Sequence, residues 1–181
     1  MTLHRHVLVL GGARSGKSRY AQGLAETCNL SKVFVATAQA HDEEMRQRIA
    51  AHRHERSQDW LTIEQPLALA SVLAVETGPD RVVLVDCLTL WLSNVLLAGS
   101  DREKATVDLV AAIRRSEGPL ILVSNEVGTG IVPATPLGRV FRDAQGRLNQ
   151  AVASACDAVV LVTAGCPRLL KPAPSFTLAL A

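Results

Sequence analysis

Short apolar runs alternate along this chain with longer segments whose apolar residues recur at helical spacing. The short runs, rich in Val and Leu, cover residues 7–10, 32–36, 81–85, 120–123 and 158–162. The segments with helical spacing cover residues 17–28, 42–56, 67–76, 88–97, 102–116 and 137–156. Apolar strands that alternate with helices are typical of a parallel sheet covered by helices on both faces. We therefore predict an α/β fold with a mainly parallel sheet flanked by helices.

The end of the chain has a different character, because prolines interrupt it. Pro167, Pro172 and Pro174 stand close together, and proline disrupts helices and central strands. We expect the tail from Pro167 onward to be irregular, apart from an edge strand at residues 176–180. The chain has no internal repeat or low-complexity linker, and its length suits one unit. Residues 1–181 are therefore predicted to form a single domain.

Composition and charge narrow the functional classes. The residues are 48% hydrophobic but only 3% aromatic, so Val, Leu, Ala and Ile must fill the core. A net charge of +2 is too small to argue for a nucleic acid or a membrane surface as partner. The longest apolar run, residues 88–98, is shorter than a membrane span, and the N-terminus lacks a signal-peptide core. The four cysteines have no C-x-x-C or zinc-site spacing, so we expect free thiols and a cytoplasmic protein.

A glycine-rich run follows the first apolar segment and leads directly into the first predicted helix. Its glycines allow backbone N–H groups to turn toward bound phosphates, and the helix N-terminus adds a favourable dipole. Lys17 is expected to bridge the β- and γ-phosphates, and Ser18 to supply an oxygen to Mg²⁺. The run fits G-x-x-x-x-G-K-[ST], the P-loop, and consists of Gly11, Gly12, Ala13, Arg14, Ser15, Gly16, Lys17 and Ser18. We therefore predict a P-loop NTPase-type enzyme that acts on the γ-phosphate of ATP or GTP.

A carboxylate, Asp86, ends the apolar run at residues 81–85. P-loop enzymes use an acid at the end of a neighbouring strand to hold Mg²⁺, which favours that role for Asp86. The alternative is that Asp86 caps the following helix. Asp86 does not begin a D-x-x-G sequence, and the chain lacks N-K-x-D for reading guanine. A kinase or transferase is therefore favoured over a signalling GTPase.

The segment at residues 42–56 is strongly charged and contains two histidines. Few apolar residues mark the helix face that would pack on the protein: Met45 and Ile49 recur at helical spacing, and His52 follows at the same spacing. A partly buried structural histidine explains this pattern as well as a functional one does. The basic residues around His52 fit either a solvated helix face or a clamp on phosphates.

Several motifs together resemble one known family. They are G-G-A-R-S-G-K-S-R at residues 11–19, R-I-x-x-H-R-x-x-R at residues 48–56, N-E-V-G-x-G-I-V-P at residues 125–133, and F-R-D-A-Q-G-R-L-N-Q at residues 141–150. The resemblance is to the bifunctional adenosylcobinamide kinase / adenosylcobinamide-phosphate guanylyltransferase of cobalamin biosynthesis, and it extends from about Val7 to Val162. It implies a P-loop α/β fold, and a trimer with active sites near subunit boundaries.

The resemblance also implies two activities. The first phosphorylates adenosylcobinamide with ATP or GTP, and the second transfers GMP from GTP to adenosylcobinamide phosphate through a GMP-histidine intermediate. By resemblance that histidine is His52, with His54 a weaker candidate; relatives can carry two adjacent histidines here, where this chain has Ala51 first. The nucleotide contacts carried over are the P-loop residues and Ala36, Thr37, Ala38, Arg53, His54, Glu55, Arg56, Glu64 and Asp86.

Two other hypotheses remain open from the sequence. One is a different small-molecule P-loop kinase, in which His52 is structural. The other is a non-catalytic module that binds GTP and a protein partner. Incubation with α-labelled GTP distinguishes the bifunctional enzyme from the other kinase and from the binding module, because only the bifunctional enzyme is expected to retain a covalent label.

Overall fold

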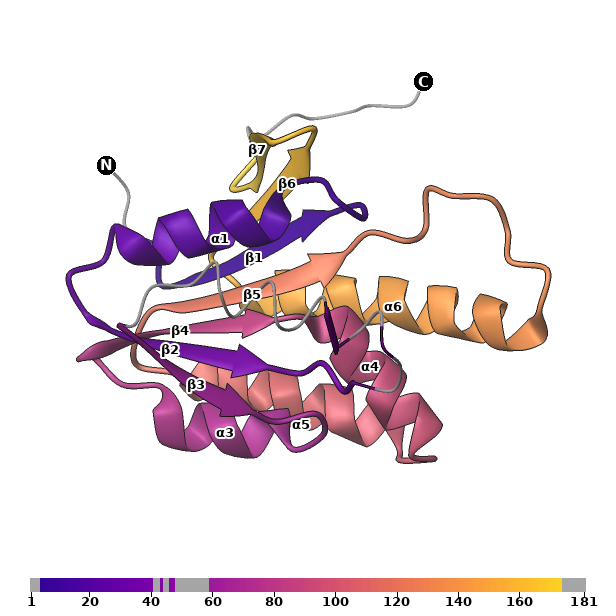
Figure 1. The fold of residues 1–181 in the computed structure, drawn as a ribbon, viewed down its shortest axis with the longest axis horizontal. Helices are drawn as coiled ribbons and strands as arrows, with labels where there is room; N and C mark the ends of the chain where they lie inside the picture. The colour runs from indigo at the N-terminus through magenta and orange to yellow at the C-terminus, as the bar shows by residue number, and fades with distance from the viewer. Residues whose placement is uncertain (1–3, 41–42, 44–45, 48–58, 174–181) are drawn as a thin grey trace, which may run out of the picture.

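The computed structural model describes residues 4–40, 43, 46–47 and 59–173. Within them a seven-stranded sheet has the order β3-β2-β4-β5-β1-β6-β7 (Figure 1). The strands are β1 (His6–Gly11), β2 (Ser31–Ala36), β3 (Trp60–Glu64), β4 (Arg81–Asp86), β5 (Leu120–Asn125), β6 (Ala158–Thr163) and β7 (Cys166–Lys171). The helices with stated bounds are α1 (Lys17–Glu26), α3 (Leu69–Glu76), α4 (Leu88–Leu97), α5 (Arg102–Arg115) and α6 (Pro136–Ala155). The predicted α/β fold is confirmed.

All strand pairs are parallel except the last, in which β7 runs antiparallel to β6. The first strand along the chain lies between β5 and β6, so its neighbours come from the second half of the sequence. Parallel strands need crossover connections, and helices supply them. The carboxyl ends of these strands therefore meet at one edge of the sheet, where ligands bind in open α/β folds.

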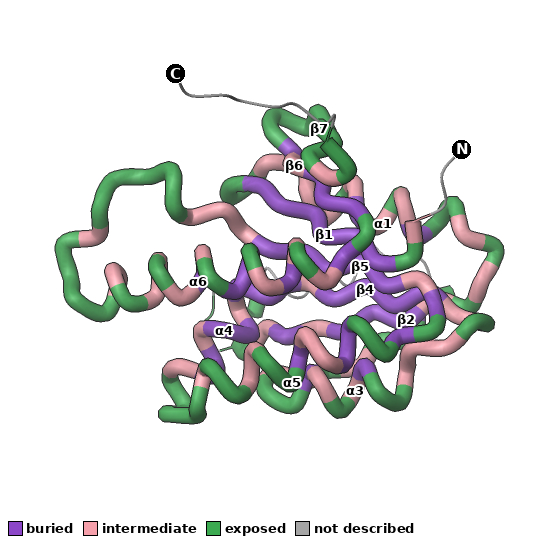
Figure 2. The backbone as a smooth tube through the Cα atoms, turned by 180° about the vertical axis from the view of Figure 1, so that it is seen from behind, coloured by how far each residue is buried: buried purple, intermediate pink, exposed green. Residues whose placement is uncertain are grey.

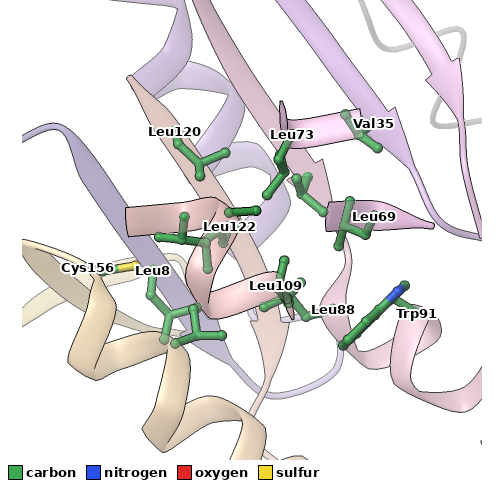
Figure 3. Close-up of a cluster of buried hydrophobic side chains, with 14 of the residues drawn as sticks. Leu8, Val35, Leu69, Leu73, Leu88, Trp91, Leu109, Leu120, Leu122 and Cys156 are labelled. Atoms are coloured by element: carbon green, nitrogen blue, oxygen red, sulfur yellow. The ribbon is translucent and has the colours of Figure 1, made fainter. Parts of the chain in front are cut away.

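Two apolar layers hold the sheet, one on each face, as its alternating side chains require. Leu8 and Leu10 of β1 pack with α3, α4, α5 and α6, in a cluster that includes Trp91 (Figure 3). Val7 and Val9 face the other way, toward α1. The burial colouring shows the same pattern, with buried central strands and exposed outer helix surfaces (Figure 2). This explains the uninterrupted Val and Leu runs, because both faces of each central strand are covered.

Two strands differ from the sequence-based expectation. β3 was not anticipated, since only Trp60 of its residues is buried and the strand lies at one edge of the sheet. The expectation of an irregular tail from Pro167 was wrong for residues 167–171, which belong to β7 at the opposite edge. Proline is compatible with such an edge position. The strand expected at residues 176–180 lies outside the described residues.

The cysteines form no disulfide, and most of the helix expected at residues 42–56 lies outside the described residues. All four cysteines are free thiols. Among the described residues, no helix has the length and apolar character needed to cross a membrane. Burial raises the pKa of the Cys156 thiol to about 12, an effect increased by the charge of Asp157 and opposed by that of Lys171. Cys156 therefore remains protonated in the folded protein at neutral pH.

Candidate phosphate-binding site

The glycine-rich loop connects the end of β1 to the start of α1, the context that the motif requires. Gly16 immediately precedes the helix with φ of 92°, and Arg14 has φ of 56°. Glycine adopts such a conformation without steric cost. The Nζ atom of Lys17 donates a hydrogen bond to the Gly12 carbonyl at 3.1 Å, so the lysine side chain folds back over the loop. The loop thus directs a cation and a helix N-terminus at the same space.

The base of the loop is tightly packed at Gly11. A Cβ atom at this position would overlap the Ser15 Oγ atom and would lie 2.6 Å from the Val162 carbonyl oxygen. By contrast, a Cβ atom at Gly12 would meet no atom within 4 Å. Gly11 is therefore required for space, because the loop returns across the end of β1 at that residue.

The β6–β7 turn supports the loop from the side. Ala164 and Gly165 form a two-residue turn in which both have positive φ, as a type I′ hairpin requires. The N–H of Gly165 donates to the Ser15 carbonyl at 2.8 Å. A Cβ atom at Gly16 would lie 3.2 Å from the Gly165 Cα atom. The last described hairpin therefore contacts the phosphate loop directly.

Asp86 ends β4 on the same face of the sheet as α1. It is in register with Val123 of β5, which packs in the apolar layer under α1, and residues in register on parallel strands share a face. The pKa of the next residue, Cys87, is raised to about 11, mainly by burial and secondly by the charge of Asp86, while the charge of Lys17 acts to lower it. Both charges are therefore close enough to act on one buried thiol.

Three further predicted nucleotide contacts lie at the same sheet edge. Ala36, the last residue of β2, is in register with Asp86 on one side and Glu64 on the other. Thr37 follows and is fully buried. Its hydroxyl donates to the Cys87 carbonyl at 2.7 Å and accepts from the Cys87 N–H at 3.0 Å. The hydroxyl of Thr37 thus joins the ends of β2 and β4.

Five of the predicted residues are not described by the structure. His52, Arg53, His54, Glu55 and Arg56 lie outside the described residues. Ala38 lies just beyond Thr37 and is half-buried. The part of the site that the structure describes is therefore the phosphate side, composed of the loop, α1 and the strand ends.

Comparison with known proteins identifies the family of this chain. Residues 7–170 match the CobU family, described as cobinamide kinase / cobinamide phosphate guanyltransferase. The chain belongs to this family.

Two curated CobP and CobU proteins are similar over nearly their whole length. The bifunctional adenosylcobalamin biosynthesis protein CobP of Pseudomonas aeruginosa is 48% identical over 171 residues, which cover 92% of this chain and 98% of the relative. The corresponding CobU of Escherichia coli is 39% identical over 174 residues, 88% of this chain and 96% of the relative. Among solved structures, the flagellar accessory protein FlaH of Methanocaldococcus jannaschii has a TM-score of 0.54 at 15% identity, with 92% of this chain and 78% of that chain covered. That likeness concerns the fold alone.

Sequence reasoning assigned no role to several polar residues that this CobU-family fold brings to the site. Asn125 ends β5 in register with Gly11. The Thr89 hydroxyl accepts a hydrogen bond from the Asn125 N–H at 2.8 Å, and Asn149 of α6 donates to the Asn125 carbonyl at 3.0 Å. The only sequence signal was that Asn125 begins the N-E-V-G run, because the contacts themselves join segments far apart in the chain.

Proposed function

We propose that this chain catalyses both reactions of its family at the described strand edge. The first is phosphorylation of adenosylcobinamide by ATP or GTP, and the second is transfer of GMP from GTP to adenosylcobinamide phosphate. The observation that carries the proposal is the register of the strand ends, which brings Asp86 to the same face as the Lys17 loop. An acid opposite a P-loop lysine is the arrangement that phosphoryl transfer requires.

The described residues are suited to hold Mg²⁺ as a complex with the nucleotide. Ser18 lies in the first turn of α1, and Asp86 supplies a carboxylate oxygen from β4. Mg²⁺ in nucleotide sites uses one or two protein oxygens together with phosphate oxygens and water. Bound there, Mg²⁺ supplies positive charge that offsets the charge developing on the phosphates. The described residues contain no cluster of three metal-binding side chains, and a nucleotide-bound Mg²⁺ does not need one.

The loop and its lysine bind and orient the triphosphate. Backbone N–H groups at the α1 N-terminus favour the negative charge of the phosphates. Lys17 would exchange its hydrogen bond with the Gly12 carbonyl for the β- and γ-phosphate oxygens. We assign nucleotide contacts in the same site to Ala36, Thr37, Ala38 and Glu64.

For GMP transfer we propose His52 as the residue that carries GMP. A neutral imidazole nitrogen can attack the α-phosphorus of GTP, with pyrophosphate leaving, and the phosphoramidate then passes GMP to the cobinamide phosphate. Arg53, His54, Glu55 and Arg56 are proposed to contact the nucleotide beside it, the arginines by pairing with phosphate. This assignment comes from resemblance in the sequence.

Incubation with α-labelled GTP tests the proposal, followed by denaturation and acid or base treatment. The wild type should retain an acid-labile, base-stable label, and His52→Ala should lose it. His54→Ala is the matched control and should still label. If His54→Ala loses the label while His52→Ala retains it, the residue assignment is wrong. A wild type that never labels would exclude the covalent histidine route.

We further propose that the protein works as a homo-oligomer, a trimer by resemblance, in the cytoplasm where its nucleotides are available. Figure 1 shows the β5–α6 connection extending beyond the sheet. This connection exposes Ile131 (97%) and Val132 (60%), and the first turn of α6 exposes Leu137 (64%). Grouped exposed apolar residues are typical of protein contacts. Light scattering of the purified protein tests this: a monomer at micromolar concentration would contradict it.

A further inference from the structure

The residue at the end of β5, Asn125, lies where the phosphate loop and the acidic strand end meet. Along β5, Ile121 and Val123 pack under α1, whereas Leu120 and Leu122 pack on the opposite side. The hydroxyl of Ser124 bonds to Asn149 of α6 at 2.7 Å and accepts from Gln145 at 2.9 Å. Side chains alternate along a strand, so Asn125 faces the α1 side.

The neighbours of Asn125 on that face are both parts of the phosphate site. On β1 its partner in register is Gly11. The Ser15 hydroxyl occupies the space that a side chain at Gly11 would fill. On β4 the same face bears Asp86, which is in register with Val123, two residues before Asn125. Adjacent strands lie about 4.8 Å apart. Asn125 therefore lies on the face of the sheet that bears both the phosphate loop and Asp86.

Two buried polar atoms lack hydrogen-bond partners at this point. They are the Asn125 Oδ1 and the Ser15 Oγ, neither of which has a partner among the described residues. An unsatisfied buried polar group costs about 1–3 kcal/mol, so its presence in a native site calls for an explanation. A bound polar ligand that completes both groups is such an explanation. A carboxamide can turn to present either its oxygen or its N–H₂ group.

Both backbone polar groups of Asn125 are hydrogen-bonded, and neither of these bonds involves its own side chain. Its N–H is bonded to Thr89 and its carbonyl to Asn149. Asn149 and Gln145 belong to a buried amide cluster beneath α6, in which Gln145 donates to the Asn149 Oδ1 at 2.9 Å. This scaffold fixes the end of β5 from the opposite face, and leaves the carboxamide directed at the site.

We propose that Asn125 is a further residue of the phosphate site, whose carboxamide contacts the terminal phosphoryl group of the bound nucleotide. The proposal rests on the proposed kinase function, since a terminal phosphoryl group must be bound there. If Asn125 contacts the terminal phosphoryl group, it contributes to the binding of ATP and not to that of ADP. Hydrogen bonds to charged groups are worth about 1.5–3 kcal/mol, so the expected loss of ATP affinity is about tenfold or more.

Calorimetry of Mg-ATP and Mg-ADP with the full chain tests the proposal. Asn125→Ala should weaken ATP binding about tenfold and leave ADP binding within about twofold. Asn125→Asp keeps the shape but adds a negative charge beside the phosphates, so it should weaken ATP binding more than alanine does. Because one variant is isosteric, a folding defect in the other does not remove the test.

Gln145→Leu is the matched control. Gln145 also has a buried amide oxygen without a partner among the described atoms, but it lies on the α6 side of the sheet. The Gln145→Leu substitution should lower the melting temperature and leave the ATP-to-ADP affinity ratio unchanged. An unchanged ratio in both Asn125 variants overturns the role of Asn125, and so does an equal change in Gln145→Leu. A wild type that binds neither nucleotide overturns the proposed function itself.

Discussion

Replacement of Gly11 by alanine tests the packing at the base of the phosphate loop. The new Cβ atom would overlap the Ser15 hydroxyl and would lie 2.6 Å from the Val162 carbonyl oxygen. The hydroxyl can rotate away, but the carbonyl belongs to β6 and pairs beside β1. Overpacking of this kind costs about 1–3 kcal/mol. For a chain of this size that corresponds to a fall in melting temperature of about 3–10 °C.

Thermal melting and ATP binding of Gly11→Ala and three comparison variants would measure the effect. Gly12→Ala is the control, because its Cβ atom would meet no atom within 4 Å and should melt close to the wild type. Ser15→Ala removes a buried hydroxyl that has no partner among the described atoms, so it should not destabilise the fold. Combined with Gly11→Ala it should recover part of the lost stability, since one of the two close contacts disappears.

Two results would refute this reasoning. Gly11→Ala melting within about 1 °C of Gly12→Ala would show that the loop has room at Gly11. Strict additivity of the Gly11 and Ser15 substitutions would show that the two side chains do not compete for space. A stable Gly11→Ala protein with weakened ATP binding would mean that the loop moves rather than the sheet.

Three other predictions follow from single features. Asp86→Asn should weaken Mg²⁺-dependent turnover with little change in melting temperature; an unstable variant whose folded fraction is fully active would indicate a structural cap instead. Asp101→Ala should cost about 1 kcal/mol of unfolding free energy, measured with urea, because Asp101 caps α5 by accepting from the Glu103 and Lys104 N–H groups at 3.0 Å. Cys156 keeps its proton in the fold up to a pKa of about 12, against 9.0 for an ordinary thiol, so its contribution is complete below pH 9 and declines above it. Cys156→Ala should therefore remove on the order of 1 kcal/mol of the stability lost between pH 7 and pH 10. Equal losses in both proteins would contradict the burial of this thiol.

The fold was predictable because its strongest signals are local. Burial on both faces gives central strands such as β4 and β5 a continuous apolar run, and such a run needs no tertiary information to be recognised. β3 and β7 lie at the sheet edges, where most of their residues are exposed. Their strand character comes from pairing with a neighbour, which their own residues do not reveal.

The sequence-based prediction of the candidate site also rests on local signals. The P-loop and the strand-ending Asp86 are short motifs with a chemical reason for each residue. The roles of Thr37, Asn125 and Gly165 depend on hydrogen bonds to residues far away in the sequence. No periodicity or motif encodes such contacts, so the sequence could name the loop but not its supports.

The hairpin contact with the loop has a consequence for how the protein is made. The G-x-x-x-x-G-K-S motif is synthesised well before Gly165, whose N–H bonds to the Ser15 carbonyl. β1 likewise has both of its neighbours, β5 and β6, in the later part of the chain. A nascent or truncated chain that stops before residue 165 therefore carries the full motif without its lateral support. Competence to bind nucleotide should therefore appear only after the β6–β7 hairpin has been made, and chains that stop before it would not sequester ATP or GTP.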